Sequence, residues 1–73
     1  VNVISPGEIR TLSSAGIKDF AELMRVAGEH SAMRRTATQD EVAQTAVFLA
    51  SEASSGITGQ VIYVDCGYSI MAN

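Results

Sequence analysis

Few side chains in this sequence are of the kinds that do nucleophilic or acid–base chemistry, and no spacing among them suits a metal site. Cys66 is the single cysteine. Because no base accompanies it, we interpret Cys66 as a small buried residue or a turn residue rather than a nucleophile. The lone His30 is expected to be a surface residue. Asp65 could form a carboxylate pair with Asp40 or Glu41, although helix capping already explains the latter two.

The other polar candidates also have simple structural interpretations. Arg34 and Arg35 are adjacent, as in many solvated or ion-pairing surface elements. Tyr63 lies in a continuous apolar stretch and is expected to be packed rather than reactive. By type and spacing alone, these residues predict no catalytic group within the chain.

An alternation of strands and helices is expected to position these residues. Residues 1–4 predict a strand that ends at a turn, because Pro6 blocks strand pairing and Gly7 allows a positive φ. From Ile17 onward the spacing of apolar residues predicts a helix, which Gly28 weakens near its end. The apolar stripe of that helix, which is typical of core packing, consists of Phe20, Leu23, Met24 and Ala27. Residues 31–37 are expected to form a basic loop.

A second helix over residues 39–51 has the clearest signal. Thr38 and Glu41 match a capping box, in which a hydroxyl and a carboxylate each accept from an unpaired backbone N–H. We expect the helix to end at the Ser-Ser-Gly run of residues 54–56. Its predicted buried face is Val42, Ala46, Leu49 and Ala50, widened by Ala43 and Val47.

Residues 60–65 (QVIYVD) predict a second strand, covered on both faces as in parallel sheets. Two short strands separated by helices predict parallel pairing through a crossover. Such a pair needs further strands. Because the chain opens within a strand and without a methionine, we expect it to be the C-terminal piece of a larger protein, with the rest of the sheet ahead of Val1.

The composition limits the class of protein. The 73 residues are 47% hydrophobic and 18% charged, which is typical of one soluble globular domain. The net charge of −3 argues against non-specific binding to nucleic acid. The longest apolar run, residues 46–50, is far shorter than the roughly 20 residues that cross a membrane. With no secretory signal and no internal disulfide, a reducing cytoplasmic location is expected.

Two sets of residues resemble a known family. The tail resembles the C-terminal end of short-chain dehydrogenase/reductases in residues 40–43 (DEVA), 48–51 (FLAS) and 57–65 (ITGQVIYVD). The front half is similar to the NADH-dependent enoyl-acyl carrier protein reductases of fatty-acid synthesis in residues 1–12 (VNVISPGEIRTL), 16–20 (GIKDF) and 34–36 (RRT).

The resemblance implies an α/β fold, the C-terminal part of a doubly wound parallel-sheet, NAD(P)-binding Rossmann fold. Residues 1–73 would be its last two strands with the intervening helices. The implied reaction is hydride transfer from NADH to a trans-2-enoyl thioester carried by acyl carrier protein. The family's catalytic tyrosine and lysine and its glycine-rich turn would lie upstream, so no catalytic residue is expected in this chain.

The resemblance also implies a set of binding residues. The implied cofactor-binding residues are Ile9, Arg10, Thr11, Leu12 and Ser13. Residues 12–20 correspond to the family's mobile loop, which closes over the acyl chain. The implied substrate-binding residues are Ala15, Gly16 and Phe20. The second helix and the last strand are expected to form a subunit contact in a homotetramer.

The sequence also departs from the family's usual pattern. Ala21 and Glu22 stand where several relatives have basic residues, which leaves Lys18 alone to attract an acidic carrier protein. Ala32 replaces a common proline, and Cys66 replaces a common glycine. Two other functions stay open. One is another short-chain reductase, such as a 3-oxoacyl reductase, and the other is a non-catalytic assembly module.

Overall fold

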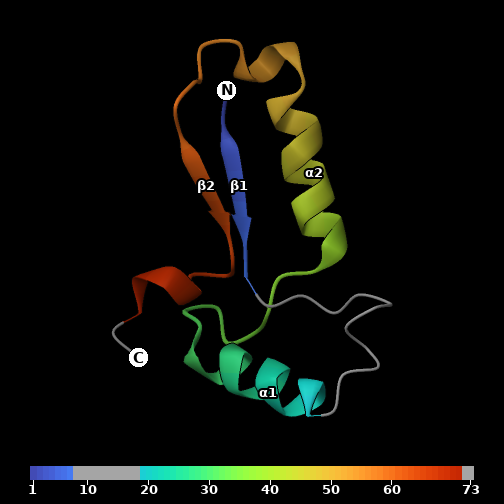
Figure 1. Cartoon of the computed structure of the whole chain (residues 1–73), viewed down its shortest axis with the longest axis vertical. Coiled ribbons are helices and arrows are strands. Elements are labelled where there is room, and N and C mark those ends of the chain that lie inside the picture. The colour runs from blue at the N-terminus through green and yellow to red at the C-terminus, as the bar shows by residue number, and fades with distance from the viewer. Residues whose placement is uncertain (8–18, 72–73) are drawn as a thin grey trace.

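The structure, a computed structural model, describes residues 1–7 and 19–71 as a small α/β arrangement. Strand β1 (Val3–Pro6) is followed by helices α1 (Phe20–His30) and α2 (Gln39–Leu49), and strand β2 (Val61–Val64) comes last. Two short 3-10 helices, η2 (Glu52–Ser54) and η3 (Tyr68–Ile70), follow α2 and β2. Figure 1 shows α2 running along the two strands, while α1 lies across their carboxyl ends.

The two strands pair in parallel, which confirms the prediction. The register runs from Val3 opposite Val61 to Pro6 opposite Val64. The Val3 amide donates to the Gln60 carbonyl at 2.9 Å, and the amide of Gly7 donates to the Val64 carbonyl at 3.3 Å. The carboxyl ends of both strands therefore open at one edge, beside α1.

The predicted bounds of the first strand were wrong, because Pro6 belongs to β1 instead of ending it earlier. In a parallel ladder, alternate residues of a strand donate to a given neighbour. Val3 and Gly7 donate to β2, so Pro6 falls at an alternate position whose nitrogen faces away from β2. Its missing N–H therefore removes no bond from this ladder. Gly7 allows a positive φ but does not adopt one.

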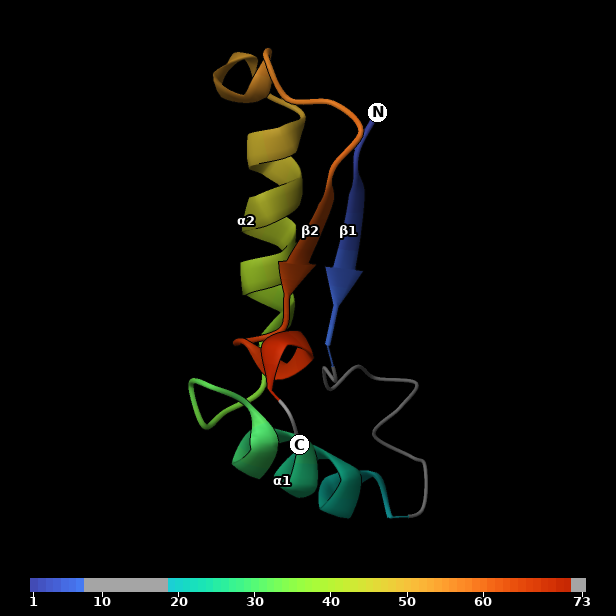
Figure 2. The same ribbon diagram turned by 90° about the vertical axis from the view of Figure 1, so that its left-hand side faces the viewer.

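Helix α2 covers one face of the strand pair (Figure 2), but the prediction of a buried helix face was wrong for the described residues. None of its residues is buried. Val42 and Leu49 are partly buried, whereas the exposed fractions of Val47 and Phe48 are 70% and 43%. The helix also ends before residue 51, where the Ser51 hydroxyl donates to the Phe48 carbonyl at 2.7 Å.

The prediction that the second strand is covered on both faces was also wrong for the described residues. Ile62 and Val64 are partly buried, whereas Val61 and Tyr63 are 51% and 58% exposed. Because successive side chains of a strand point to opposite faces, α2 covers one set and the other set is open. Tyr63 is therefore not packed as we expected.

Helix α1 buries Phe20, Ala27 and Gly28. Leu23, which we placed on the apolar stripe, is 55% exposed. The helix continues past Gly28 to His30, which is exposed as predicted. Ile17, the predicted start of the helix, lies outside the described residues.

Within residues 1–7 and 19–71, no helix is both long and apolar enough to span a membrane. The same residues contain no group of three or more histidine, cysteine, aspartate or glutamate side chains placed to hold a metal ion.

Candidate functional site

The candidate site lies at the carboxyl edge of the strand pair, where parallel α/β sheets bind their ligands. Strand β1 ends at Pro6 and leads toward the predicted cofactor residues 9–13. Those five residues, together with Ala15 and Gly16, lie outside the described residues. The structure therefore shows the elements around the site: α1, the loop 31–37, and the turn between β2 and η3 (Figure 1).

Phe20 is the one predicted substrate-binding residue that the structure describes. It is the first residue of α1, and 7% of its surface is exposed. A buried phenyl ring at this end of α1 fits both a core residue and the wall of an acyl pocket. Its role in substrate binding stays a prediction.

The two strand exits lie close together. A Cβ atom added at Gly7 would lie 2.9 Å from the Cβ of Asp65. Glycine is needed at position 7 because of this close approach, since its backbone does not require a positive φ. The exits of β1 and β2 are thus packed against each other.

Asp65 stabilises the turn that follows β2. It is 8% exposed, and its carboxylate accepts from the amides of Gly67 and Ser69, both at 3.0 Å. This is the usual way in which an aspartate holds a tight turn. Asp65 therefore acts in turn formation, and no carboxylate pair with Asp40 or Glu41 is needed to explain it.

Cys66 lies in this turn and is partly buried, so the turn residue is the one of our two alternatives that the structure supports. Its φ of 55° is in the left-handed region, where glycine is favoured. The carbonyl of Cys66 accepts from the Met33 amide at 2.9 Å. This bond joins the turn after β2 to the loop 31–37.

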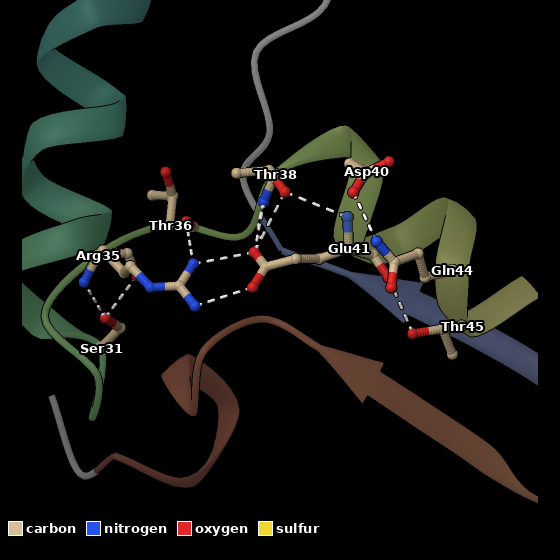
Figure 3. A network of polar contacts seen from close by, with 8 residues as sticks. All are labelled: Ser31, Arg35, Thr36, Thr38, Asp40, Glu41, Gln44 and Thr45. Carbon is tan, nitrogen blue, oxygen red and sulfur yellow. Dashed lines mark hydrogen bonds and ion pairs between the residues drawn. The ribbon is translucent and has the colours of Figure 1, made fainter.

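Sequence reasoning found the capping box but missed the network around it (Figure 3). The Thr38 hydroxyl accepts from the Glu41 amide at 3.1 Å, and the Glu41 carboxylate accepts from the Thr38 amide at 2.9 Å. The same carboxylate accepts two bonds from the Arg35 guanidinium, at 2.9 and 2.8 Å. Glu41 thus caps α2 and anchors the loop 31–37 at once.

This double use changes the acidity of Glu41. Its bonds from the Arg35 guanidinium and then from the Thr38 amide lower the pKa of Glu41 from its usual value of 4.5 to about 2. The pKa of Arg35 is raised above its usual value, chiefly by its bonds to Glu41. Both side chains are therefore ionised at neutral pH, as a charge-assisted pair requires.

Ser31 is another residue of the polar network around the capping box that the sequence did not reveal. It is 1% exposed. Its Oγ accepts from the Arg35 amide at 3.0 Å and lies 2.8 Å from the Arg35 carbonyl. A serine in a polar loop gives no sequence signal of burial, so only the closure of the loop could identify it.

Comparison with known proteins identifies the family. The family described as enoyl-(acyl carrier protein) reductase matches residues 1–69. The enoyl-(acyl carrier protein) reductase (NADH) FabI of Bacillus cereus is 52% identical over 71 residues, which cover 97% of this chain and 28% of that protein. The corresponding protein of Synechocystis is 54% identical over 71 residues, with the same two shares. The chain thus spans about 28% of the length of these curated relatives.

Solved structures agree. The Bacillus cereus reductase, whose crystal structure contains NADP+ and an indole naphthyridinone, matches the whole chain with a TM-score of 0.87 and 51% identity. The reductase of Anaplasma phagocytophilum, solved with NAD, matches the whole chain with a TM-score of 0.85 and 41% identity. In both cases the match covers 28% of the solved chain. The expected α/β fold of Rossmann type is confirmed, and the chain belongs to the enoyl-(acyl carrier protein) reductase family.

Proposed function

We propose that this chain is the C-terminal segment of a single Rossmann-type domain in an NADH-dependent enoyl-acyl carrier protein reductase. The enzyme transfers a hydride from NADH to a trans-2-enoyl thioester in fatty-acid synthesis. The observation that carries the proposal is the match of residues 1–69 to the reductase family, together with relatives named as NADH-dependent reductases at 52% and 54% identity.

Within that enzyme, the segment after β1 binds the cofactor through Ile9, Arg10, Thr11, Leu12 and Ser13. The support is topological, because the segment follows the carboxyl end of a parallel strand, where such folds hold their ligands. Two-point pairing of a backbone with the nicotinamide would fix which ring face offers the hydride. Orientation of this kind lowers the barrier by making the reacting atoms neighbours.

The acyl chain of the substrate contacts Ala15, Gly16 and Phe20. The place of Phe20 at the start of α1, the helix that lies across the carboxyl edge, supports this assignment, since apolar side chains line the pockets that bind such ligands. The proton that completes the reduction, and the groups that stabilise the enolate, belong to the part of the enzyme ahead of Val1.

The partners and location follow from the same assignment. The thioester is delivered on acyl carrier protein, and the enzyme works as a homotetramer in the cytoplasm. The open face of β2, with Val61 and Tyr63, and the exposed Val47 and Phe48 of α2 support burial against further protein. An open groove of about 610 Å³ between α2 and β1 also supports it.

The test is turnover by the purified full-length protein, followed by NADH absorbance with a trans-2-enoyl thioester as substrate. We expect NADH to be consumed with the enoyl thioester and not with a 3-oxoacyl thioester. Consumption with the 3-oxoacyl substrate alone would instead identify a different short-chain reductase. A folded assembly that consumes no cofactor with either substrate would identify an assembly module.

The cofactor residues are tested by Thr11→Ala, measured as the dissociation constant for NADH. We expect weaker binding because a hydroxyl contact is lost. The matched control is Thr58→Ala, at the opposite end of the strand pair, beside the bond that the Gly59 amide donates to the Val1 carbonyl at 2.8 Å. Equal affinity in the two variants would contradict the assignment of Thr11.

A further inference from the structure

We propose that Arg35 is a positioning residue: through its ion pair with Glu41 it fixes helix α1, and thereby holds Phe20 at the substrate side of the site. This inference rests on the proposed function. It goes beyond that proposal because it assigns a role in acyl-substrate binding to a residue that contacts neither cofactor nor substrate.

Arg35 connects helix α1, which lies across the carboxyl ends of the strands, to helix α2, which runs along them. Its backbone is tied to the end of α1, since the Arg35 amide donates to the Ser31 hydroxyl at 3.0 Å. Ser31 in turn follows His30, and its amide donates to the Gly28 carbonyl at 3.4 Å. The Arg35 guanidinium reaches the first turn of α2, where it bonds both carboxylate oxygens of Glu41. One residue therefore links the end of α1 to the start of α2 (Figure 3).

The same corner is also fixed against the strands. The Met33 amide donates to the Cys66 carbonyl at 2.9 Å. Ala32 packs so closely on Gly67 that a Cβ added at Gly67 would lie 2.6 Å from the Ala32 Cβ. The end of α1 is thus held between the turn after β2 and the start of α2.

Phe20 lies at the far end of the helix that this corner holds. Helix α1 has 11 residues, so its ends are about 15 Å apart at a rise of about 1.5 Å per residue. A rotation of roughly 5° about the Ser31 end would therefore move Phe20 by about 1.3 Å, on the same helix geometry. A misplacement of about 1 Å is enough to weaken a well-positioned contact severalfold or more.

The proposed NADH-binding residues are held in place by the strand ladder and not by the Arg35–Glu41 pair. The proposed NADH residues follow β1, whose place is set by its ladder to β2 from Val3 to Gly7. Loss of the Arg35–Glu41 pair should therefore affect the acyl substrate and leave NADH binding intact. A general loss of folding would affect both.

The experiment compares Arg35→Gln with Arg25→Gln in the full-length enzyme. Arg25 is a matched control because it is an exposed arginine on α1 itself, paired with Glu22 and Glu29. We expect Arg35→Gln to raise the KM for the enoyl thioester about fivefold, the upper range for a bidentate, half-exposed pair. The kcat and the dissociation constant for NADH should stay within about twofold, and Arg25→Gln should resemble the wild type, because its pairs lie within one helix.

A cycle with Phe20→Leu tests whether Arg35 acts through Phe20. If it does, the two substitutions raise KM by less together than the product of their separate effects. Glu41→Gln should reproduce the effect of Arg35→Gln while keeping the capping box, because glutamine suits that position. Arg35→Lys should recover part of the lost KM, since it keeps the charge but not the two-point geometry.

The outcomes separate the two proposals. An unchanged KM in Arg35→Gln, equal losses for NADH and thioester, or independent effects of positions 20 and 35 would each overturn the positioning role. If the wild-type protein does not oxidise NADH when any enoyl thioester is supplied, the proposed function is overturned, and this inference with it. If Arg35→Gln fails to fold, Arg35→Lys and Glu41→Gln carry the same comparison.

Discussion

Replacement of Gly67 by alanine should be among the most damaging single changes at the carboxyl edge. Gly67 has a φ of 86°, so an alanine there carries backbone strain. Its Cβ would also lie 2.6 Å from the Ala32 Cβ and 3.5 Å from the Ala32 nitrogen. Non-bonded carbons are most stable at about 3.5–4.0 Å, so either the turn after β2 or the loop 31–37 must move.

The loss of stability has two parts that can be separated. A left-handed alanine costs roughly 1–2 kcal/mol. The overlap is with the Ala32 Cβ, which cannot rotate away from its own backbone, and it adds about 1–3 kcal/mol, as in overpacked cores. We therefore expect Gly67→Ala to lower the free energy of unfolding by about 2–5 kcal/mol, a large share of the roughly 5–15 kcal/mol that stabilises a domain.

Gly59→Ala is the matched control. Gly59 has a φ of 73°, and a Cβ added there would meet nothing within 4 Å. This variant therefore carries the strain without the overlap, and its loss should be only about 1–2 kcal/mol. Urea unfolding of the full-length protein measures the loss of stability in both variants, provided that the free energy of unfolding falls with urea concentration at the same slope in each.

A second substitution tests the named contact. Ala32→Gly removes the methyl group that the new side chain would meet, so Gly67→Ala with Ala32→Gly should regain most of the overlap part and none of the strain part. Equal losses in Gly67→Ala and Gly59→Ala, or no recovery in the double variant, would refute the reasoning from the Ala32 contact.

Three further changes test other parts of the structure. Cys66→Gly should raise the free energy of unfolding by about 0.5–1 kcal/mol, because a left-handed φ suits glycine better than cysteine. If chemical denaturation shows a lower free energy of unfolding instead, the packing of the thiol contributes more to stability than the backbone strain costs. The depressed pKa of Glu41, about 2 against a usual 4.5, means that its contribution to stability is complete above pH 4.5 and is lost as the pH falls toward 2. The difference in thermal midpoint between the wild type and Glu41→Gln should therefore shrink over that range, and a constant difference would show that the charge is irrelevant. Val47→Asp, on the exposed side of α2, should shift the full-length assembly to smaller species in light scattering, whereas an unchanged mass with an intact fold would remove Val47 from the proposed subunit contact.

Local signals in the sequence were sufficient for the elements that depend on neighbours along the chain. The Thr38–Glu41 box predicts where α2 begins, because both partners lie within one turn of helix. The parallel pairing of the strands also follows from the sequence, since a connection through helices excludes a hairpin. The turn at Cys66 was anticipated for the same reason: its determinants are local.

Burial could not be predicted as well, because it depends on atoms distant in the sequence. A continuous apolar run such as residues 61–64 is typical of a strand covered on both faces. In the described residues only one face is covered, and Tyr63 is 58% exposed. The prediction that Pro6 ends the first strand was wrong for a related reason, since the effect of its missing N–H depends on which side of the strand the nitrogen faces.

The candidate site shows the same division between local and distant determinants. The residues named by resemblance, Ile9 through Gly16, lie outside the described residues, and only Phe20 has a place in the structure. Ser31 and the Arg35–Glu41 bonds could not be inferred from spacing, because the charged partners lie six positions apart and no helix joins them. Their contact exists only once the loop 31–37 has closed on α2.

Two of the departures from the usual family pattern meet at one place in the structure. The resemblance to the family implies a common glycine at position 66, where this chain has cysteine, and a common proline at position 32, where it has alanine. The Cys66 carbonyl accepts from Met33, the residue next to Ala32, while Gly67 packs against Ala32 itself. Strain at Cys66 and the backbone freedom of a non-proline residue at position 32 therefore act on two neighbouring contacts between the turn after β2 and the loop 31–37. These two contacts hold the end of α1. The replacements of Cys66 by glycine and of Ala32 by proline should therefore be tested together, and their effects on the free energy of unfolding should be non-additive.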